Sequence, residues 1–182
     1  AEIAQVTAHH GYIKVNGYLE TGKENIWAFG DAIGRHMFTH VANKEVALVW
    51  HNANHEQKIE MNYDAVPHAV FARPQIAAVG LTEEQARRDH TIMVGTAHYG
   101  DVAKGEAMME TDGFAKVIVD QGENRLLGFH IIGPHAPILI QEVINAMALD
   151  GKAGWIYRGM HIHPALSELI LSALGNLREP DG

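Results

Sequence analysis

The 182-residue sequence contains no cysteine. A chain without cysteine forms no disulfide bond, offers no thiolate to a metal ion and has no thiol nucleophile of its own. Any redox chemistry at sulfur in which the chain takes part must therefore use thiols from another segment or another molecule. The same absence leaves the redox compartment undetermined.

Long apolar runs and clusters of positive charge are missing as well. Apolar stretches such as residues 137–140 and 168–174 fall far short of the roughly 20 apolar residues of a membrane-spanning helix. Lys and Arg number 14 against 22 Asp and Glu, which gives a formal net charge of −8. Nucleic-acid binding depends on clustered Lys and Arg that neutralise phosphates. The sequence therefore predicts a protein that binds neither a membrane nor a nucleic acid.

The residues that are present suit a globular protein. The chain is 47% hydrophobic and 20% charged, an ordinary globular composition, and its length predicts one domain with an additional segment. The first residues, Ala1 to Ala4, include no initiator methionine and no signal-peptide pattern. We therefore expect a fragment or a processed chain.

The first part of the chain predicts short strands and one helix. Residues Tyr12–Leu19 indicate a strand pair that turns at Asn16-Gly17, a dipeptide favoured in tight hairpins. Asn25–Phe29 is a compact apolar run, typical of a buried strand. A helix capped by Thr39 should follow, because apolar residues recur there at near-helical spacing: Val41, Val46, Leu48, Val49 and Ala53. Polar residues after this helix place a domain boundary between residues 62 and 63.

Residues 63–182 predict an α+β domain, in which helices cover a mainly antiparallel sheet. Apolar segments bounded by turn residues predict five strands, at Ala69–Ala72, Gln75–Gly80, Ile92–Tyr99, Phe114–Asp120 and Arg125–Gly133. Capping residues and helical periodicity predict three helices, from Thr82 to about Asp89, over Ala136–Leu149 and over Pro164–Leu174.

Two groups of residues could carry chemistry, and the first is Gly30-Asp31. The pair ends the apolar run, so the carboxylate of Asp31 should lie at a ligand crevice. Thr39 follows eight residues later, and the amides and dipole of a helix that begins there would point into the same crevice. The alternative is an ordinary strand end with a solvated turn.

The second group is His163 and Glu168. With Pro164 at the first helical position, Glu168 should lie in the second turn of the helix, close to the imidazole. A carboxylate bonded to one imidazole nitrogen makes the other a better base near neutral pH. The alternatives are a surface histidine beside an unrelated glutamate and a metal site that uses His161 and His163. We assign no role to five other histidines: His9, His10, His36, His51 and His55.

The sequence resembles the pyridine nucleotide-disulfide oxidoreductases. Residues 21–31 (TGKENIWAFGD) are similar to the second flavin-binding signature of that family, and His163-Pro164 with Glu168 resembles its acid/base motif. Residues 70–82 and 125–133 resemble the dimerisation domain of dihydrolipoamide dehydrogenases and mycothione reductases. The resemblance therefore implies a remnant of the FAD-binding domain in residues 1–62, followed by a dimerisation domain in residues 63–182.

The resemblance also implies roles for these residues. Asp31, next to Gly30, would bind hydroxyl groups on the ribityl side of FAD. The helix start formed by Thr39, His40, Val41 and Ala42 would face the pyrimidine edge of the flavin. His163 would be the acid/base, paired with Glu168, and would reach the flavin and disulfide of the partner in a homodimer.

The activity implied is that of an FAD-dependent enzyme that uses NAD or NADP, most similar to dihydrolipoamide dehydrogenase. The substrate would be a small dithiol or disulfide, the location cytoplasmic, and a larger dehydrogenase complex is a further candidate partner. The alternatives are a mycothione reductase, another small-disulfide reductase, or a dimerisation module without catalysis. The family's Gly-x-Gly-x-x-Gly motif, its Cys-x4-Cys pair and its nicotinamide domain are absent from the sequence, so we expect this chain alone not to hold FAD tightly. Ala165 replaces a threonine found in many relatives.

Overall fold

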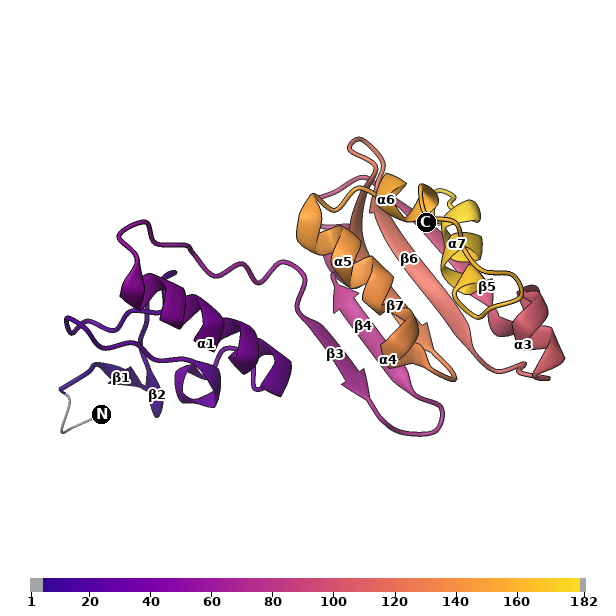
Figure 1. Cartoon of the computed structure of the whole chain (residues 1–182). Helices are drawn as coiled ribbons and strands as arrows, with labels where there is room; N and C mark the ends of the chain where they lie inside the picture. Colours follow the sequence, from indigo (N-terminus) through magenta and orange to yellow (C-terminus); the bar gives the residue numbers. More distant parts are fainter. Residues whose placement is uncertain (1–4, 181–182) are drawn as a thin grey trace. The chain divides into compact units, whose positions relative to one another are not determined.

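A computed structural model describes residues 5–180. The chain divides into two compact units between Tyr63 and Asp64. Figure 1 shows short strands and one long helix in the first unit, and a sheet with several helices in the second.

The first unit contains a small hairpin, a 3-10 helix and a long helix. The hairpin pairs β1 (Ala8–His9) with β2 (Tyr12–Ile13). The predicted strand pair around Asn16-Gly17 is therefore wrong, because the hairpin lies earlier in the chain. The Asn16 side chain accepts hydrogen bonds from the backbone amides of Tyr18 and Glu20, each at 3.0 Å. These local bonds form a turn that competes with strand pairing.

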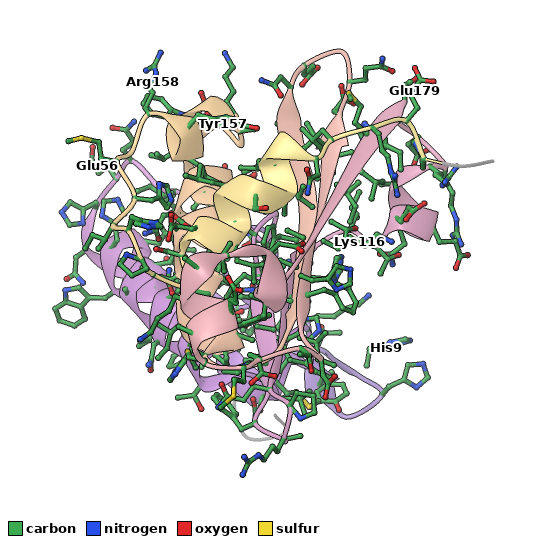
Figure 2. The ribbon with its side chains drawn as sticks, turned by 90° about the vertical axis from the view of Figure 1, so that its right-hand side faces the viewer. His9, Glu56, Lys116, Tyr157, Arg158 and Glu179 are labelled. Atoms are coloured by element: carbon green, nitrogen blue, oxygen red, sulfur yellow. The ribbon has the colours of Figure 1, made fainter. Side chains whose placement is uncertain are left out.

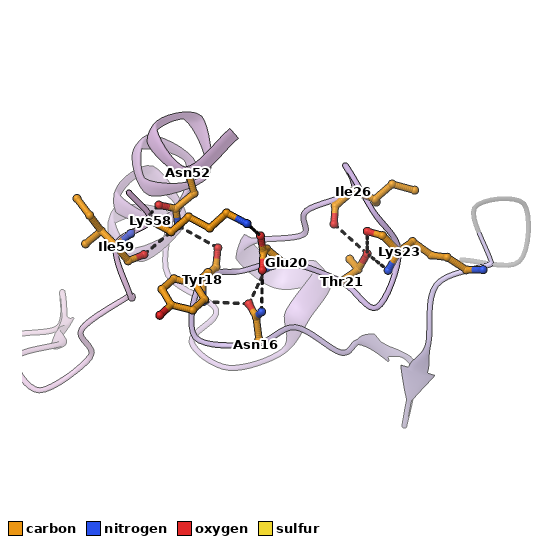
Figure 3. Close-up of polar contacts among 9 residues, drawn as sticks. All are labelled: Asn16, Tyr18, Glu20, Thr21, Lys23, Ile26, Asn52, Lys58 and Ile59. Carbon is orange, nitrogen blue, oxygen red and sulfur yellow. Dashed lines mark hydrogen bonds and ion pairs between the residues drawn. The ribbon is translucent and has the colours of Figure 1, made fainter. Parts of the chain in front are cut away.

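The predicted strand over Asn25–Phe29 is also wrong. Only Trp27 pairs across the chain, in an isolated bridge with Glu20, and Phe29 is 38% exposed. The Thr21 hydroxyl donates to the carbonyl of Ile26 at 2.9 Å and accepts from the Lys23 amide at 3.2 Å (Figure 3). These bonds close a compact turn where the apolar pattern predicts an extended segment.

The long helix is α1 (Thr39–Asn54), and its buried face is partly polar. Val41, Glu45 and Asn52 are the buried residues, whereas Val46 of the predicted apolar stripe is 42% exposed. The Asn52 amide donates to the carbonyls of Tyr18 and Ile59 at 3.1 and 2.9 Å, and its oxygen accepts from the Ile59 amide at 2.8 Å (Figure 3). Hydrogen bonds thus replace apolar packing at the end of this helix and tie it to the turn at residues 16–20.

The second unit contains a five-stranded antiparallel sheet, which confirms the predicted fold class. The strand order is β3-β4-β7-β6-β5. The strands are β3 (Pro67–Val70), β4 (Ile76–Gly80), β5 (Ile92–His98), β6 (Phe114–Asp120) and β7 (Arg125–Ile132). The first of them begins two residues before the predicted Ala69–Ala72, and the other four lie within a residue of their expected bounds.

A β-bulge in strand β7 decides which side chains enter the core. Ile118 pairs with Gly128 and Val119 with Leu126, so Leu127 is an extra residue. A bulge shifts the alternation of side chains by one residue. Leu126 and Phe129 consequently both enter the main core, and Leu127 packs on the other face with Ile118.

Helices α4 (Ala136–Leu139), α5 (Gln141–Leu149) and α7 (Glu168–Gly175) contact the sheet on the side of the main core (Figure 1). The predicted single helix over Ala136–Leu149 is wrong, because a turn at Ile140 divides it into α4 and α5. Two short helices had no predicted counterpart, α3 (Ala103–Ala107) and α6 (Gly154–Tyr157).

Helix α2 (Glu83–Ala86) has the predicted capping box of Thr82 and Gln85 but ends before Asp89. Its Glu83 pairs with Lys116 at 2.5 Å, and Figure 2 shows Lys116 on the side of the sheet away from α7. No helix in residues 5–180 is both long and apolar enough to cross a membrane.

Candidate functional site

His163 and Glu168 lie together at the start of α7. Nδ1 of His163 is 2.9 Å from Oε1 of Glu168, and the amide of Ala165 donates to Oε2 at 2.9 Å. The Ala165 amide and then the imidazole hold the pKa of Glu168 below its ordinary value. An ionised carboxylate only accepts, so Nδ1 carries the proton and the neutral ring keeps its lone pair on Nε2. With 69% of its side chain exposed, His163 can exchange a proton with an incoming ligand.

The chain reaches this geometry by a different local structure from the one predicted. Helix α7 begins at Glu168, with Ser167 as its N-cap, and not at Pro164. After Pro164, the backbone amide of Glu168 donates to the carbonyl of Ala165 at 3.3 Å. The amide of Leu169 donates to the carbonyl of Leu166 at 3.1 Å. These i to i+3 bonds form a tight turn. Glu168 is therefore the first helical residue and not a member of the second turn.

A second histidine and carboxylate pair lies beside the first. Nε2 of His161 is 3.0 Å from Oε2 of Glu142 on α5, and Nδ1 is 3.2 Å from the carbonyl oxygen of Gly159. Only 8% of the His161 side chain is exposed, against 32% for Glu142. Sequence reasoning missed Glu142, because 19 residues separate it from His161 and no local spacing connects them.

The His161 pair borders a pocket of about 480 Å³, whose lining also includes Trp155, Met160 and Ser167. Within residues 5–180, no group of three or more His, Cys, Asp or Glu side chains is placed to hold a metal ion. The two imidazoles do not share a ligand, since each contacts its own carboxylate.

In the first unit, Gly30-Asp31 packs against the first turn of α1. Gly30 is buried and has a φ of +64°, and a Cβ added to it would lie 3.3 Å from Cβ of Ala42. Asp31 is the second residue of the 3-10 helix η1 (Gly30–Ile33), the acidic residue of its first turn, and is exposed. The structure therefore brings Asp31 close to the helix start predicted from the sequence.

Thr39 is the first residue of α1 and not its cap. The N-cap is Phe38, which makes no side-chain capping bond, and the first turn of the helix holds no acidic residue. Thr39 and His40 are exposed, Ala42 is half-buried and Val41 is buried. A helix start without its own side-chain cap suits a ligand that brings hydrogen-bond acceptors or negative charge. An adjacent Asp31 carboxylate suits a ligand with hydroxyl donors, so these residues fit the flavin-side groups that the family resemblance implies.

The fully buried Glu45 of α1 connects this helix to Gly30 of η1 and to Tyr63. Its Oε2 accepts from the Gly30 amide and its Oε1 from the Tyr63 hydroxyl, each at 2.6 Å. Burial and then this hydrogen bond raise the pKa of Tyr63 to about 12. Sequence reasoning missed Glu45, although a carboxylate four residues after Val41 on the apolar side of a helix is a signal of a satisfied buried acceptor.

Comparison with known proteins identifies the second unit. The family described as pyridine nucleotide-disulphide oxidoreductase, dimerisation domain, matches residues 66–174. This chain belongs to that oxidoreductase family. The matched range contains the whole sheet and both histidine and carboxylate pairs, whereas Gly30-Asp31 and the start of α1 precede it.

Individual oxidoreductases match over nearly the whole chain. Mycothione reductase of Mycobacterium tuberculosis is 43% identical over 98% of this chain and 40% of its own length. Dihydrolipoyl dehydrogenase of Synechocystis is 38% identical over 90% of this chain and 36% of its own. The HOCl-induced flavoprotein disulfide reductase RclA of Escherichia coli superposes with a TM-score of 0.86 and 29% identity, covering 96% of this chain and 41% of RclA. The chain thus spans about 40% of the length of these relatives.

Proposed function

We propose that this chain is the C-terminal part of an FAD-dependent, NAD(P)-linked disulfide oxidoreductase similar to dihydrolipoamide dehydrogenase. The observation that carries the proposal is the 2.9 Å contact between Nδ1 of His163 and Glu168, which leaves an exposed imidazole in a domain of this family. The enzyme would interconvert a dithiol and NAD(P)+ with a disulfide, NAD(P)H and one proton.

In this proposal, His163 handles the proton that the thiol chemistry releases. Its Nε2 takes the proton from a substrate thiol as the resulting thiolate attacks a disulfide, and returns it to the leaving thiolate in the reverse direction. Glu168 fixes the ring through Nδ1 and stabilises the imidazolium. Asp31 and the α1 start at Thr39, His40, Val41 and Ala42 would hold FAD, which supplies the electron transfer between nicotinamide and sulfur when it is bound. The cysteine pair would come from residues outside this sequence.

Mycothione reductase is the second candidate activity. The reductase of that name is 43% identical to the chain, against 38% for the dihydrolipoyl dehydrogenase of Synechocystis. In either case the proposed enzyme is a cytoplasmic homodimer that acts on a small dithiol or disulfide. Assembly into a larger dehydrogenase complex would accompany the first activity.

Steady-state turnover of the full-length protein decides between these activities. Dihydrolipoamide, mycothiol disulfide and glutathione disulfide are each assayed with both nicotinamides. We expect turnover with one dithiol or disulfide and a yellow, flavin-containing protein. A full-length protein without flavin and without turnover on any of these substrates would contradict the proposed function.

Glu45 provides a test of the flavin site. Replacing it with alanine in the full-length protein leaves the buried Gly30 amide and the part-buried Tyr63 hydroxyl without their acceptor, which costs about 1–3 kcal/mol for a fully buried group. We expect a lower ratio of flavin to protein absorbance and a lower melting temperature. Glu45→Gln, which keeps an acceptor oxygen, should lose less flavin. Lys44→Ala, at an exposed neighbouring position on α1, serves as the control, and equal flavin content in Glu45→Ala and Lys44→Ala would contradict this role.

A further inference from the structure

The buried His161 ring lies between two oxygen atoms. Nδ1 is 3.2 Å from the Gly159 carbonyl oxygen, which can only accept, so Nδ1 carries a proton. Nε2 is 3.0 Å from Oε2 of Glu142. This contact requires a proton as well, because a lone pair on Nε2 would otherwise face a carboxylate oxygen. The pair is therefore either an imidazolium with a carboxylate or a neutral imidazole with a carboxylic acid, and in both cases one proton is shared between them.

Burial distinguishes this pair from an exposed ion pair. Oε1 of Glu142 is buried and has no hydrogen-bond partner among residues 5–180. Burial raises the pKa of Glu142, and the neighbouring His161 opposes that shift. Breaking the contact would leave Nε2 of the largely buried His161 ring without its partner, beside the buried Oε1 of Glu142, so we expect the shared proton and the contact to be retained together.

The pair also holds the segment that carries His163. Met160 and Ile162 are 101% and 79% exposed, and 69% of the His163 side chain is exposed. Only 8% of the His161 side chain is exposed. Among residues 160–163 it is therefore the buried side chain, and its contact with Glu142 attaches this segment to α5. Two residues further on, His163 is attached to α7 through Glu168.

We infer that His161 and Glu142 are positioning residues, which fix the backbone on the N-terminal side of His163 and thereby aim its imidazole at the sulfur of the substrate. Glu168 alone fixes the ring to α7 but leaves the preceding backbone free to move. The inference rests on the proposed acid/base function of His163 and adds a second pair to it. Misplacing a catalytic group by about 1 Å can cost roughly 10²-fold in rate.

Glu142→Ala in the full-length enzyme tests the inference. We expect kcat with the dithiol or disulfide to fall about 10- to 100-fold, with the KM for the nicotinamide unchanged. The rate of flavin reduction by the nicotinamide, followed by stopped-flow absorbance, should also be unchanged, because that step does not use His163. Glu142→Gln should recover activity to within about threefold of wild type, since its amide can donate to Nε2 of a neutral His161. Gln141→Ala is the matched control on the same helix, because the exposed Gln141 side chain donates to the equally exposed Asn145 at 3.0 Å.

The outcomes separate this inference from the proposed function. Normal turnover in Glu142→Ala together with a severe loss in His163→Ala would overturn the positioning role and leave the function in place. Normal turnover in both variants would overturn both. Equal slowing of the nicotinamide and thiol steps, or an equal loss in Gln141→Ala, would indicate general destabilisation and reject the positioning role. If Glu142→Ala does not fold, His161→Phe, which keeps a buried ring but has no donor for Glu142, is expected to show the same selective loss, and normal thiol turnover in it would overturn the inference.

Discussion

Full-length enzyme with His163→Ala is expected to turn over about 10²- to 10⁴-fold more slowly than wild type, the range typical of general acid/base catalysis. The expected loss arises in the thiol step, where the Nε2 lone pair left by the contact with Glu168 would accept the proton. Because His163 is exposed and supports no core packing, flavin content and melting temperature should stay close to wild type. Steady-state rates with dithiol substrate and stopped-flow flavin absorbance measure the two steps separately.

Glu168→Gln should cost less than His163→Ala. The glutamine keeps an acceptor for Nδ1 but loses the charge that stabilises the imidazolium. The carboxylate is ionised through neutral pH, because the Ala165 amide and His163 lower its pKa. Its contribution is therefore present above the ordinary glutamate pKa and is lost only as the pH falls through the lowered value.

A histidine without a catalytic role would behave differently. Surface substitutions usually change stability by less than about 0.5 kcal/mol, and His9→Ala, at an exposed position (Figure 2), provides that reference. If His163→Ala changes turnover by no more than His9→Ala does, the acid/base assignment is wrong, and the contact with Glu168 serves only the start of α7.

Ile162→Glu is expected to convert a dimer into monomers. Ile162 is 79% exposed and lines the same pocket as the wholly exposed Met160, and clustered exposed apolar residues mark interaction surfaces. In a dimerisation domain, a partner subunit is the occupant that fits this surface. A glutamate buried there without a cation would cost several kcal/mol, and each 1.4 kcal/mol raises the dissociation constant about tenfold.

Sedimentation or light scattering at micromolar concentration measures this change, and thiol turnover should fall with the dimer fraction. Met109→Glu is the control, because Met109 is 86% exposed and follows α3, away from the His163 segment in the chain. A wild-type chain that is monomeric at micromolar concentration, or an Ile162→Glu variant that remains dimeric, would contradict the prediction.

The sheet could be predicted from the sequence, because its strands are apolar runs between turn residues and three of its four pairings join strands that are consecutive in the chain. The first unit could not be predicted in the same way. There, side chains such as Asn16 and Thr21 bond to their own turns, so the apolar pattern indicated strands that do not form. The strand propensity of a segment does not reveal that side-chain hydrogen bonds will compete with strand pairing.

The site shows the same division between local and distant contacts. The proximity of His163 and Glu168 could be predicted, because only five positions separate them in the chain. The turn that brings them together nevertheless differs from the predicted helix. Glu45 with Tyr63 and Glu142 with His161 are 18 and 19 residues apart. Contacts at that separation depend on the folded path of the chain, which periodicity alone does not determine.

The attachment of the histidine segment at both ends limits its length. Glu142 holds His161 from α5, and Glu168 holds His163 from α7, through contacts of 3.0 and 2.9 Å. One inserted residue would add roughly 3.3–3.6 Å of extended chain, more than either contact could absorb. Among natural homologues, insertions or deletions between residues 161 and 168 should therefore be selected against, even where single residues of the segment are substituted.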